Sequence, residues 1–354
     1  MKIPHYKKVH NRFRLNGFSC SRQDLKEIAY SFVKEGADYE RVIGDFLLDW
    51  LDENDTLPVT TSGTTGRPKQ IRVSKQAMVH SAVRTAEFFD LPAGGAALLC
   101  LPVDFIAGKM MLVRAIVLGL ELDLTSPRLH PEFPKGKNYE FVAMIPQQVE
   151  NTIDQISQIK VLLIGGAAMS KNLRKKLIPH GGCYETYGMT ETLTHIALAP
   201  VQEPPAPFRT LEGVRVTQDS TGCLCIDAPH VLGRPIQTQD LVNCLDDRTF
   251  YFLGRKDFVI NSGGIKLHPE RIEQQLSDQI EVPFFITKKV HQTFGEVPVL
   301  VVEAPSNSVT AEVLKTLVGL DKYEMPKGIY TLPEFIKTPN GKIKREVNAS
   351  RLDL

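Results

Sequence analysis

The stretch Thr61-Ser62-Gly63-Thr64-Thr65-Gly66-Arg67-Pro68-Lys69 follows a short strand-like run, Thr56 to Thr60. It places four hydroxyl side chains, two glycines and Lys69 within nine residues. Because glycine adopts positive φ easily, successive N–H groups in such a loop can point toward an anion. The hydroxyl groups add donors, and Lys69 adds a positive charge suited to phosphate. The stretch predicts a phosphate-binding loop, and a Gly/Thr-rich surface turn is the alternative.

The residues that follow separate this loop from the Walker A type. A Walker A loop ends in Gly-Lys-Ser/Thr and opens a helix. Here Pro68 interrupts, and Gln70 to Val73 alternates in polarity like a strand. We therefore expect a clamp of the hairpin type, suited to a leaving pyrophosphate.

Segments that resemble strands and helices alternate after this loop, which predicts a doubly wound α/β core. The expected strands are 97–101, 120–124, 141–145, 161–164 and 183–187, and the expected helices are 74–89, 106–118, 147–156 and 170–177. Two further helices, 21–36 and 39–51, are expected before the loop. From Val214 short β segments (223–226, 241–245 and 250–253) predict a small barrel or sheet. Residues 1–254 would form this large domain. Residues 255–354 would form a small α+β domain, with helices over 269–276 and 310–318 and strands near 284–290 and 297–302.

Composition excludes several classes of protein. A chain of 354 residues predicts two domains, and its net charge of +1 gives no electrostatic case for nucleic acid or an anionic membrane. The longest apolar run, Met110 to Leu124, is interrupted by Arg114 and Glu121, so no membrane insertion is expected. The six cysteines show no paired metal spacing, which favours reduced thiols in a cytoplasmic protein.

Further chemical groups lie where expected strands end. In Tyr187-Gly188-Met189-Thr190-Glu191, the aromatic ring offers a stacking face to a base, and the Thr190–Glu191 pair offers hard oxygen atoms to Mg²⁺. A helix cap is the alternative for that pair. Gly165 and Gly166 would let a ligand approach the backbone at the carboxyl edge of the sheet, unless they form a plain turn.

Three polar groups follow later in the chain. Asp240 precedes an apolar strand and could bind ribose hydroxyl groups or merely start that strand. Lys342 follows an Asn-Gly turn pair, where a solvated hairpin tip is the simpler explanation. Arg255, close to the expected domain junction, completes the set.

Taken in order, these stretches resemble the motifs of the adenylate-forming acyl-CoA synthetase superfamily, from about Pro58 to Arg345. The motifs are TSGTTGRPK (61–69), YGMTET (187–192), TQD (238–240), GRKDFVINSGGIKLHPERIE (254–273) and PNGKIKR (339–345). The resemblance implies a large α/β domain, a hinged C-terminal lid domain, and ATP, Mg²⁺ and coenzyme A as cofactors and substrates.

The resemblance also assigns roles. It implies catalytic roles for Lys342, Glu191 and Thr190, a magnesium ligand in Glu191, a hinge at Asp257 and a thiol tunnel at Gly263 and Gly264. It places ATP against Thr61, Ser62, Gly63, Thr64, Thr65, Gly66, Lys69, Gly165, Gly166, Tyr187, Gly188, Met189, Asp240 and Arg255. In these roles Tyr187 stacks on adenine, Asp240 binds ribose, and Lys342 bridges the substrate carboxylate and the α-phosphate.

The chain departs from the superfamily pattern in three places. Only about 60 residues precede the phosphate loop, Phe105 stands where histidine is usual, and Phe258 replaces a second acidic residue after the hinge. The short chain most resembles o-succinylbenzoate–CoA ligases of menaquinone biosynthesis. Their substrate carries a second carboxylate, so the acid site would involve Phe105 and a cation or donor among Lys109, Arg114 and His195. Each of these three has a purely structural alternative.

Other functions stay open. The chain could activate another aromatic or fatty acid, load a carrier protein in place of coenzyme A, or be a degenerate nucleotide-binding protein. The expected partners are therefore small molecules, namely a carboxylic acid, ATP and coenzyme A, and a homodimer is also left open.

Overall fold

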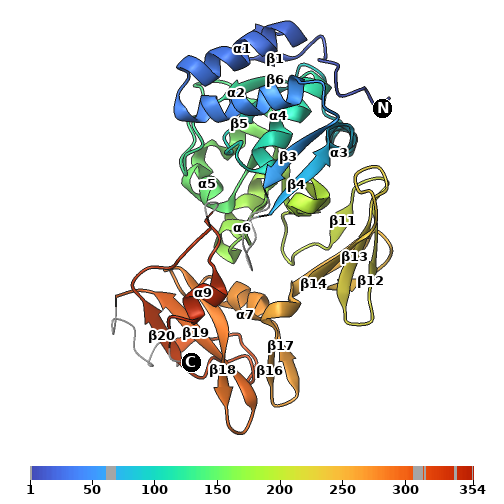
Figure 1. The fold of residues 1–354 in the computed structure, drawn as a ribbon. Coiled ribbons are helices and arrows are strands. Elements are labelled where there is room, and N and C mark those ends of the chain that lie inside the picture. Colours follow the sequence, from blue (N-terminus) through green and yellow to red (C-terminus); the bar gives the residue numbers. More distant parts are fainter. Residues whose placement is uncertain (1, 61–68, 306–313, 315, 339–340, 353) are drawn as a thin grey trace.

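The chain folds into two lobes, each built on its own sheet (Figure 1). The computed structural model describes residues 2–60, 69–305, 314, 316–338, 341–352 and 354. A 13-stranded sheet, whose last strand in sequence ends at Arg255, forms the large lobe, and a five-stranded sheet that starts at Ile260 forms the small lobe. Among the described residues, none of the helices has both the length and the apolar character needed to cross a bilayer.

Five parallel strands form the centre of the large lobe. In spatial order they are β6 (Glu121–Leu124), β5 (Ala96–Leu99), β7 (Tyr139–Met144), β8 (Ile159–Ile164) and β9 (Cys183–Gly188). Their side chains alternate between two cores: Leu99 and Leu163 belong to one buried cluster, whereas Leu98 and Leu162 belong to the other. Helices cover both faces, so the predicted doubly wound core is confirmed.

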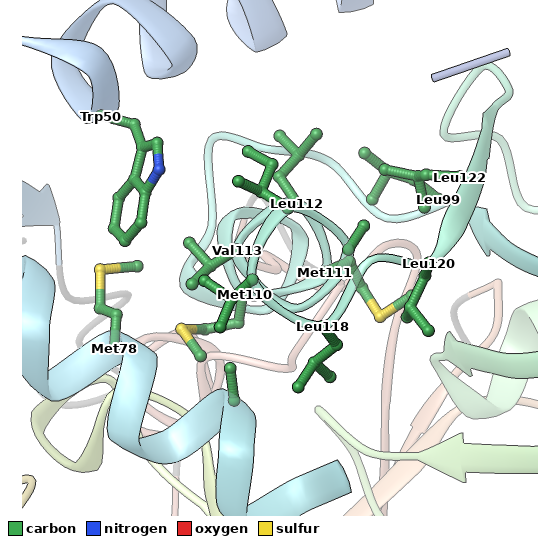
Figure 2. Close-up of a cluster of buried hydrophobic side chains, with 14 of the residues drawn as sticks. Trp50, Met78, Leu99, Met110, Met111, Leu112, Val113, Leu118, Leu120 and Leu122 are labelled. Carbon is green, nitrogen blue, oxygen red and sulfur yellow. The ribbon is translucent and has the colours of Figure 1, made fainter. Parts of the chain in front are cut away.

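Four helices build the larger of these two cores: α1 (Arg22–Glu35), α2 (Asp38–Leu51), α3 (Lys75–Phe89) and α4 (Ile106–Leu118). The side chains of Ser21 and Ser74 cap α1 and α3, as the sequence predicts. Figure 2 shows α4 along its axis, with apolar side chains on every side of it, among them Met110, Leu112 and Val113. A helix that is apolar all round is buried, which makes Arg114 on α4 an exception to explain.

On the other face of the sheet, one predicted element is wrong in detail. The single helix expected over 147–156 is divided into α5 (Pro146–Asn151) and a 3₁₀ segment (Ile153–Gln158). The hydroxyl group of Thr152 donates to the Gln148 carbonyl at 2.7 Å, and the φ and ψ angles of Thr152 are not helical. Such side-chain bonds to the backbone compete with the helix. The predicted helix over 170–177 is α6 (Lys171–Leu177).

The short β segments after residue 195 extend the large sheet. β10 (His195–Pro200) pairs antiparallel with β9, and β11 (Phe208–Thr210) joins it to β15 (Thr249–Arg255). The outer strands are β14 (Ile236–Cys244), β13 (Cys223–Asp227) and β12 (Arg215–Gln218). At the opposite edge lie β1 (Arg14–Leu15) and β2 (Phe18–Ser19). The expected small barrel or sheet is thus an antiparallel continuation of the main sheet.

In its described part, the small lobe packs two helices on an antiparallel hairpin. Its described strands are β16 (Ile260–Ser262), β17 (Ile265–Leu267), β18 (Phe284–His291), β19 (Gly295–Glu303) and β20 (Ile329–Leu332), and its described helices are α7 (Pro269–Leu276) and α9 (Arg345–Ala349). The predicted helix over 269–276 is α7, whereas the one expected over 310–318 falls largely outside the described residues.

Candidate active site

A separate hairpin holds the ends of the predicted phosphate loop. β3 (Thr56–Thr60) and β4 (Gln70–Ser74) pair antiparallel, with Thr60 opposite Gln70. The strand predicted after the loop is therefore confirmed, and the loop joins two paired strands. Thr61 to Pro68, which include six of the predicted phosphate-binding residues, lie outside the described residues.

Glycines at the carboxyl edge of the sheet allow close backbone contacts. A Cβ atom on Gly165, at the end of β8, would lie 2.1 Å from the Thr186 hydroxyl oxygen. A Cβ atom on Gly188, at the end of β9, would lie 2.2 Å from the Thr194 carbonyl oxygen. Larger residues are excluded at both positions. This packing holds the following turn, which carries Thr190 and Glu191, beside the ends of these strands.

Tyr187, Asp240 and Arg255 form a continuous polar network. The Tyr187 hydroxyl group donates to Asp240 Oδ2 at 2.5 Å, and Arg255 Nη1 lies 3.5 Å from Asp240 Oδ1. Arg255 Nη2 also pairs with Asp257 Oδ2 at 2.6 Å. Burial, together with the charge of Asp240, raises the pKa of Tyr187, so the hydroxyl group stays protonated and donates. The network links β9, β14 and β15 to the expected hinge.

Lys342 is carried into this region by a turn of the small lobe. Its backbone N–H donates to Thr338 Oγ1 at 3.0 Å, and the Thr338 N–H donates to the Lys342 carbonyl at 2.7 Å. Burial lowers the pKa of Lys342; the charge of Asp240 raises it in part, and that of Arg255 lowers it. The ammonium group thus lies within electrostatic range of both residues. A Cβ atom on the neighbouring Gly341 would lie 3.8 Å from Gln147 Oε1 of α5, in the large lobe.

Two contacts that sequence reasoning missed join the lobes at α6. The Lys171 N–H donates to Ser277 Oγ at 3.3 Å, and Lys175 Nζ lies 3.5 Å from Asp278 Oδ2. No sequence motif marks these four residues, because the contact exists only between surfaces of separate elements. In this arrangement the turn of Lys342 faces the large lobe. The β16–β17 hairpin, which carries Gly263 and Gly264, points away from the large lobe (Figure 1).

A second polar cluster lies inside the large lobe, around Arg114. Arg114 Nε donates to Thr85 Oγ1 at 3.3 Å, and Arg114 Nη2 donates to Thr194 Oγ1 at 3.2 Å. Arg114 Nη2 is 3.5 Å from His195 Nδ1, and His195 Nε2 is 3.1 Å from Thr85 Oγ1. Thr85 was not foreseen from the sequence, where it is one of several polar residues in the α3 segment.

The charge of Arg114 is not neutralised by the part of the chain that is described. Arg114 is 2% exposed, and no carboxylate of a described residue pairs with it. Burial lowers its pKa to about 9, so it is still cationic at neutral pH. Burial and the neighbouring guanidinium lower the pKa of His195, which is therefore neutral.

The other two residues predicted for the acid site lie elsewhere. Lys109 Nζ donates to the Val103 carbonyl at 2.6 Å and lies 5.3 Å from the ring centroid of Phe46. Lys109 and Arg114 are five positions apart, about 140° around α4, so they leave different faces of the helix. Phe105 precedes the first residue of α4 and is half-buried.

Glu191, the predicted magnesium ligand, is exposed at the turn after β9. Among the described residues no group of three or more His, Cys, Asp or Glu side chains is placed to hold a metal.

The fold is that of adenylate-forming enzymes. The model of the AMP-binding enzyme family matches residues 48–231, just over half of the chain. The chain belongs to the AMP-binding enzyme family.

Comparisons with individual proteins agree with this. The chain is 25% identical to a 2-succinylbenzoate–CoA ligase of Bacillus cytotoxicus, over 81% of this chain and 68% of that protein. It is 27% identical to the enzyme of the same name from a Geobacillus strain, over 80% of this chain and 66% of that protein.

Solved structures show the same fold. A Dyadobacter fermentans protein, described as acyl-CoA synthetase (AMP-forming)/AMP-acid ligase II-like, has a TM-score of 0.60 and 32% identity, and covers 92% of this chain and 98% of its own. The o-succinylbenzoate coenzyme A synthetase of Bacillus subtilis, in complex with ATP and magnesium, has a TM-score of 0.69 and 20% identity, over 82% of this chain and 68% of that chain.

Proposed function

We propose that this protein is an AMP-forming acid–CoA ligase and that its acid is o-succinylbenzoate, which would place it in menaquinone biosynthesis. The curated relatives carry this activity in their names, and they match four-fifths of the chain. The single observation that carries the choice of acid is the buried Arg114, which has no carboxylate partner among the described residues. A substrate with two carboxylates can present one for reaction and one to this guanidinium.

The reaction proceeds in two steps. An oxygen of the substrate carboxylate attacks the α-phosphorus of ATP, forming an acyl adenylate and releasing pyrophosphate. The thiol of coenzyme A then attacks the acyl carbon, forming the thioester and releasing AMP. The first step brings two anions together, so the site must neutralise charge and hold the reactants in line.

The residues of this chain divide these tasks. Lys342 carries its charge to the end of the site that holds Asp240 and Arg255, where a ribose and its α-phosphate would lie. Asp240 would accept the ribose hydroxyl groups, and Tyr187 would contact adenine. Glu191 would hold Mg²⁺, which supplies charge neutralisation at the phosphates when it is bound.

The division of the chain into residues 1–254 and 255–354 is part of this proposal, with Asp257 as the hinge. Lys342 is needed only in the first step, so a hinged lobe can withdraw it afterwards and bring Gly263 and Gly264 to the thiol. A homodimer and a cytoplasmic location are further expectations. Light scattering of the purified protein and fractionation of cells test them.

A panel of carboxylic acids, scored for pyrophosphate release and then for thioester, tests the function. We expect release with o-succinylbenzoate and a thioester with free coenzyme A. If a thioester forms only on a carrier protein, the protein is an enzyme that loads carrier proteins. If pyrophosphate is released only with a different acid, that acid is the substrate. ATP binding without release for any acid would identify a degenerate binder and contradict the proposal.

A further inference from the structure

The aromatic residue after the hinge, Phe258, lies against a cation from the catalytic-lysine segment. The guanidinium carbon of Arg345 is 5.1 Å from the centroid of the Phe258 ring. A guanidinium over an aromatic face is attracted by the negative charge of that face. Phe258 thus offers Arg345 a π face directly after the expected hinge.

A carboxylate of α7 binds the same arginine. Arg345 Nη2 lies 2.5 Å from Glu273 Oε2, and Arg345 Nη1 pairs with Glu273 Oε1, so the guanidinium binds the carboxylate in a bidentate manner. Glu273 Oε1 also accepts the Ile286 N–H at 2.7 Å. The side chains of Arg345 and Glu273 are 18% and 17% exposed. Burial opposes the charge of Arg345, but Glu273 raises the pKa of Arg345 above its ordinary value, so the guanidinium stays charged.

The first turn of α7 contacts the other side of the hinge. Glu270 Oε1 accepts the Arg255 N–H at 3.3 Å. A Cβ atom on Gly254 would lie 2.7 Å from Glu270 Oε2, so glycine makes room for this carboxylate. One helix therefore contacts the last residues of the large lobe through Glu270 and the lysine segment through Glu273.

The polar contacts of the Asn348 side chain stay within the lysine segment. The Asn348 side chain bonds to the Ile336 N–H and carbonyl and to the Lys344 carbonyl, which ties the two sides of the turn to each other. Arg345, three positions after Lys342, instead ties the turn to α7 and to Phe258. Its contacts set where the turn stands relative to the hinge.

We infer that Arg345 is a positioning residue for Lys342. Phe258 and Glu273 hold its guanidinium from two sides, so rotation at the hinge moves the hinge-side residue, α7 and the lysine segment as one body. This inference rests on the proposed function for its effect on catalysis. A loosened segment would still carry Lys342, but at a poorer position, and the adenylation rate is sensitive to such displacements.

Three variants of the full-length protein test this role. Arg345→Lys keeps the positive charge but loses the two-nitrogen contact of the guanidinium with Glu273. Phe258→Leu keeps an apolar side chain but removes the aromatic ring. Phe258→Tyr keeps an aromatic ring at this position. Arg351→Lys is the matched control, because Arg351 Nη1 donates to the Glu334 carbonyl and an Asn348 oxygen and to neither Glu273 nor Phe258.

We expect kcat for acid-dependent ATP–pyrophosphate exchange to fall about tenfold in Arg345→Lys and Phe258→Leu, with KM for ATP changed less than threefold. Phe258→Tyr should recover most of the rate. Thioester formation from supplied acyl adenylate should change less than threefold in all variants. Equal loss in both half-reactions, or no loss in either, would overturn the inference.

Hydrogen exchange over residues 336–349 provides a readout that needs no catalysis. We expect faster exchange in Arg345→Lys and Phe258→Leu than in wild type or Arg351→Lys. Unchanged exchange would contradict the positioning role even if no acid is found. Faster exchange in a protein without acid-dependent turnover would instead support the mechanical link and reject the proposed function.

Discussion

Replacing Arg114 with methionine is the sharpest test of the acid site. Methionine has similar length and no charge, so it removes the guanidinium from Thr85, Thr194 and His195 while it fills most of the space. The variant should keep its fold, because exchanging an uncompensated buried charge for an apolar side chain is often neutral or stabilising.

The expected magnitude follows from the burial of this charge. Burial lowers the pKa of Arg114 from 12.5 to about 9. At 1.36 kcal/mol per pKa unit, the fold disfavours the charged form by about 5 kcal/mol. A substrate carboxylate recovers part of that free energy, and losing one partner of a buried ion pair costs about 3–5 kcal/mol. Three kcal/mol corresponds to a loss of about 100-fold.

The assay compares two substrates. Pyrophosphate release is measured with o-succinylbenzoate and with the analogue in which hydrogen replaces the carboxylate that does not react. We expect Arg114→Met to lower kcat/KM for o-succinylbenzoate at least about 100-fold and kcat/KM for the analogue less than about threefold. Lys109→Met is the matched control, because Lys109 Nζ bonds to the Val103 carbonyl outside this cluster.

The ratio of the two kcat/KM values decides the outcome. If a folded Arg114→Met variant keeps the wild-type preference for the dicarboxylate, Arg114 does not bind the second carboxylate. If Lys109→Met removes that preference instead, the counter-charge comes from Lys109, on a different face of α4. Melting temperature establishes that each variant is folded.

Other predictions concern Lys342 and the base of the phosphate-loop hairpin. Lys342→Ala should lower acid-dependent ATP–pyrophosphate exchange about 100-fold or more and spare thioester formation from supplied acyl adenylate. Equal loss of both activities would argue against a small lobe that uses Lys342 in the first step only. Because burial in the free protein lowers the pKa of Lys342 from 10.5, the ammonium group is lost as pH rises through that lower pKa. The alkaline limb of kcat/KM for exchange should therefore lie below 10.5, and a limb at 10.5 or above would refute this. Lys75 is fully buried and pairs at 2.6 Å with the more exposed Asp52. In urea unfolding, Asp52→Ala should therefore cost about 3 kcal/mol, because it leaves a buried charge unpaired. Lys75→Met should cost about 1 kcal/mol, and the reverse order would contradict this account.

The sequence by itself determined the elements of the fold and the order of its motifs. The apolar run 106–118, the cap at Ser74 and the alternation of strands with helices are local properties, because hydrophobic period and capping act over a few residues. The same holds for Tyr187, Asp240 and Lys342, which the motifs identify one by one. The break at Thr152 escaped prediction because a single side-chain bond to the backbone caused it.

Tertiary structure decided which of these residues meet. The Arg114 cluster joins α3, α4 and β10, whose residues are up to 110 positions apart in sequence, and no local pattern connects them. In the sequence, Lys109 is an equally plausible cation for the second carboxylate. In the structure it leaves the same helix on another face and donates to a backbone carbonyl. The packing of separate elements likewise brings Lys342 near Asp240. It also places Arg345 in contact with Phe258 and Glu273. Charge and burial can be assigned only after that packing, because the free energy of a buried ion depends on every group around it.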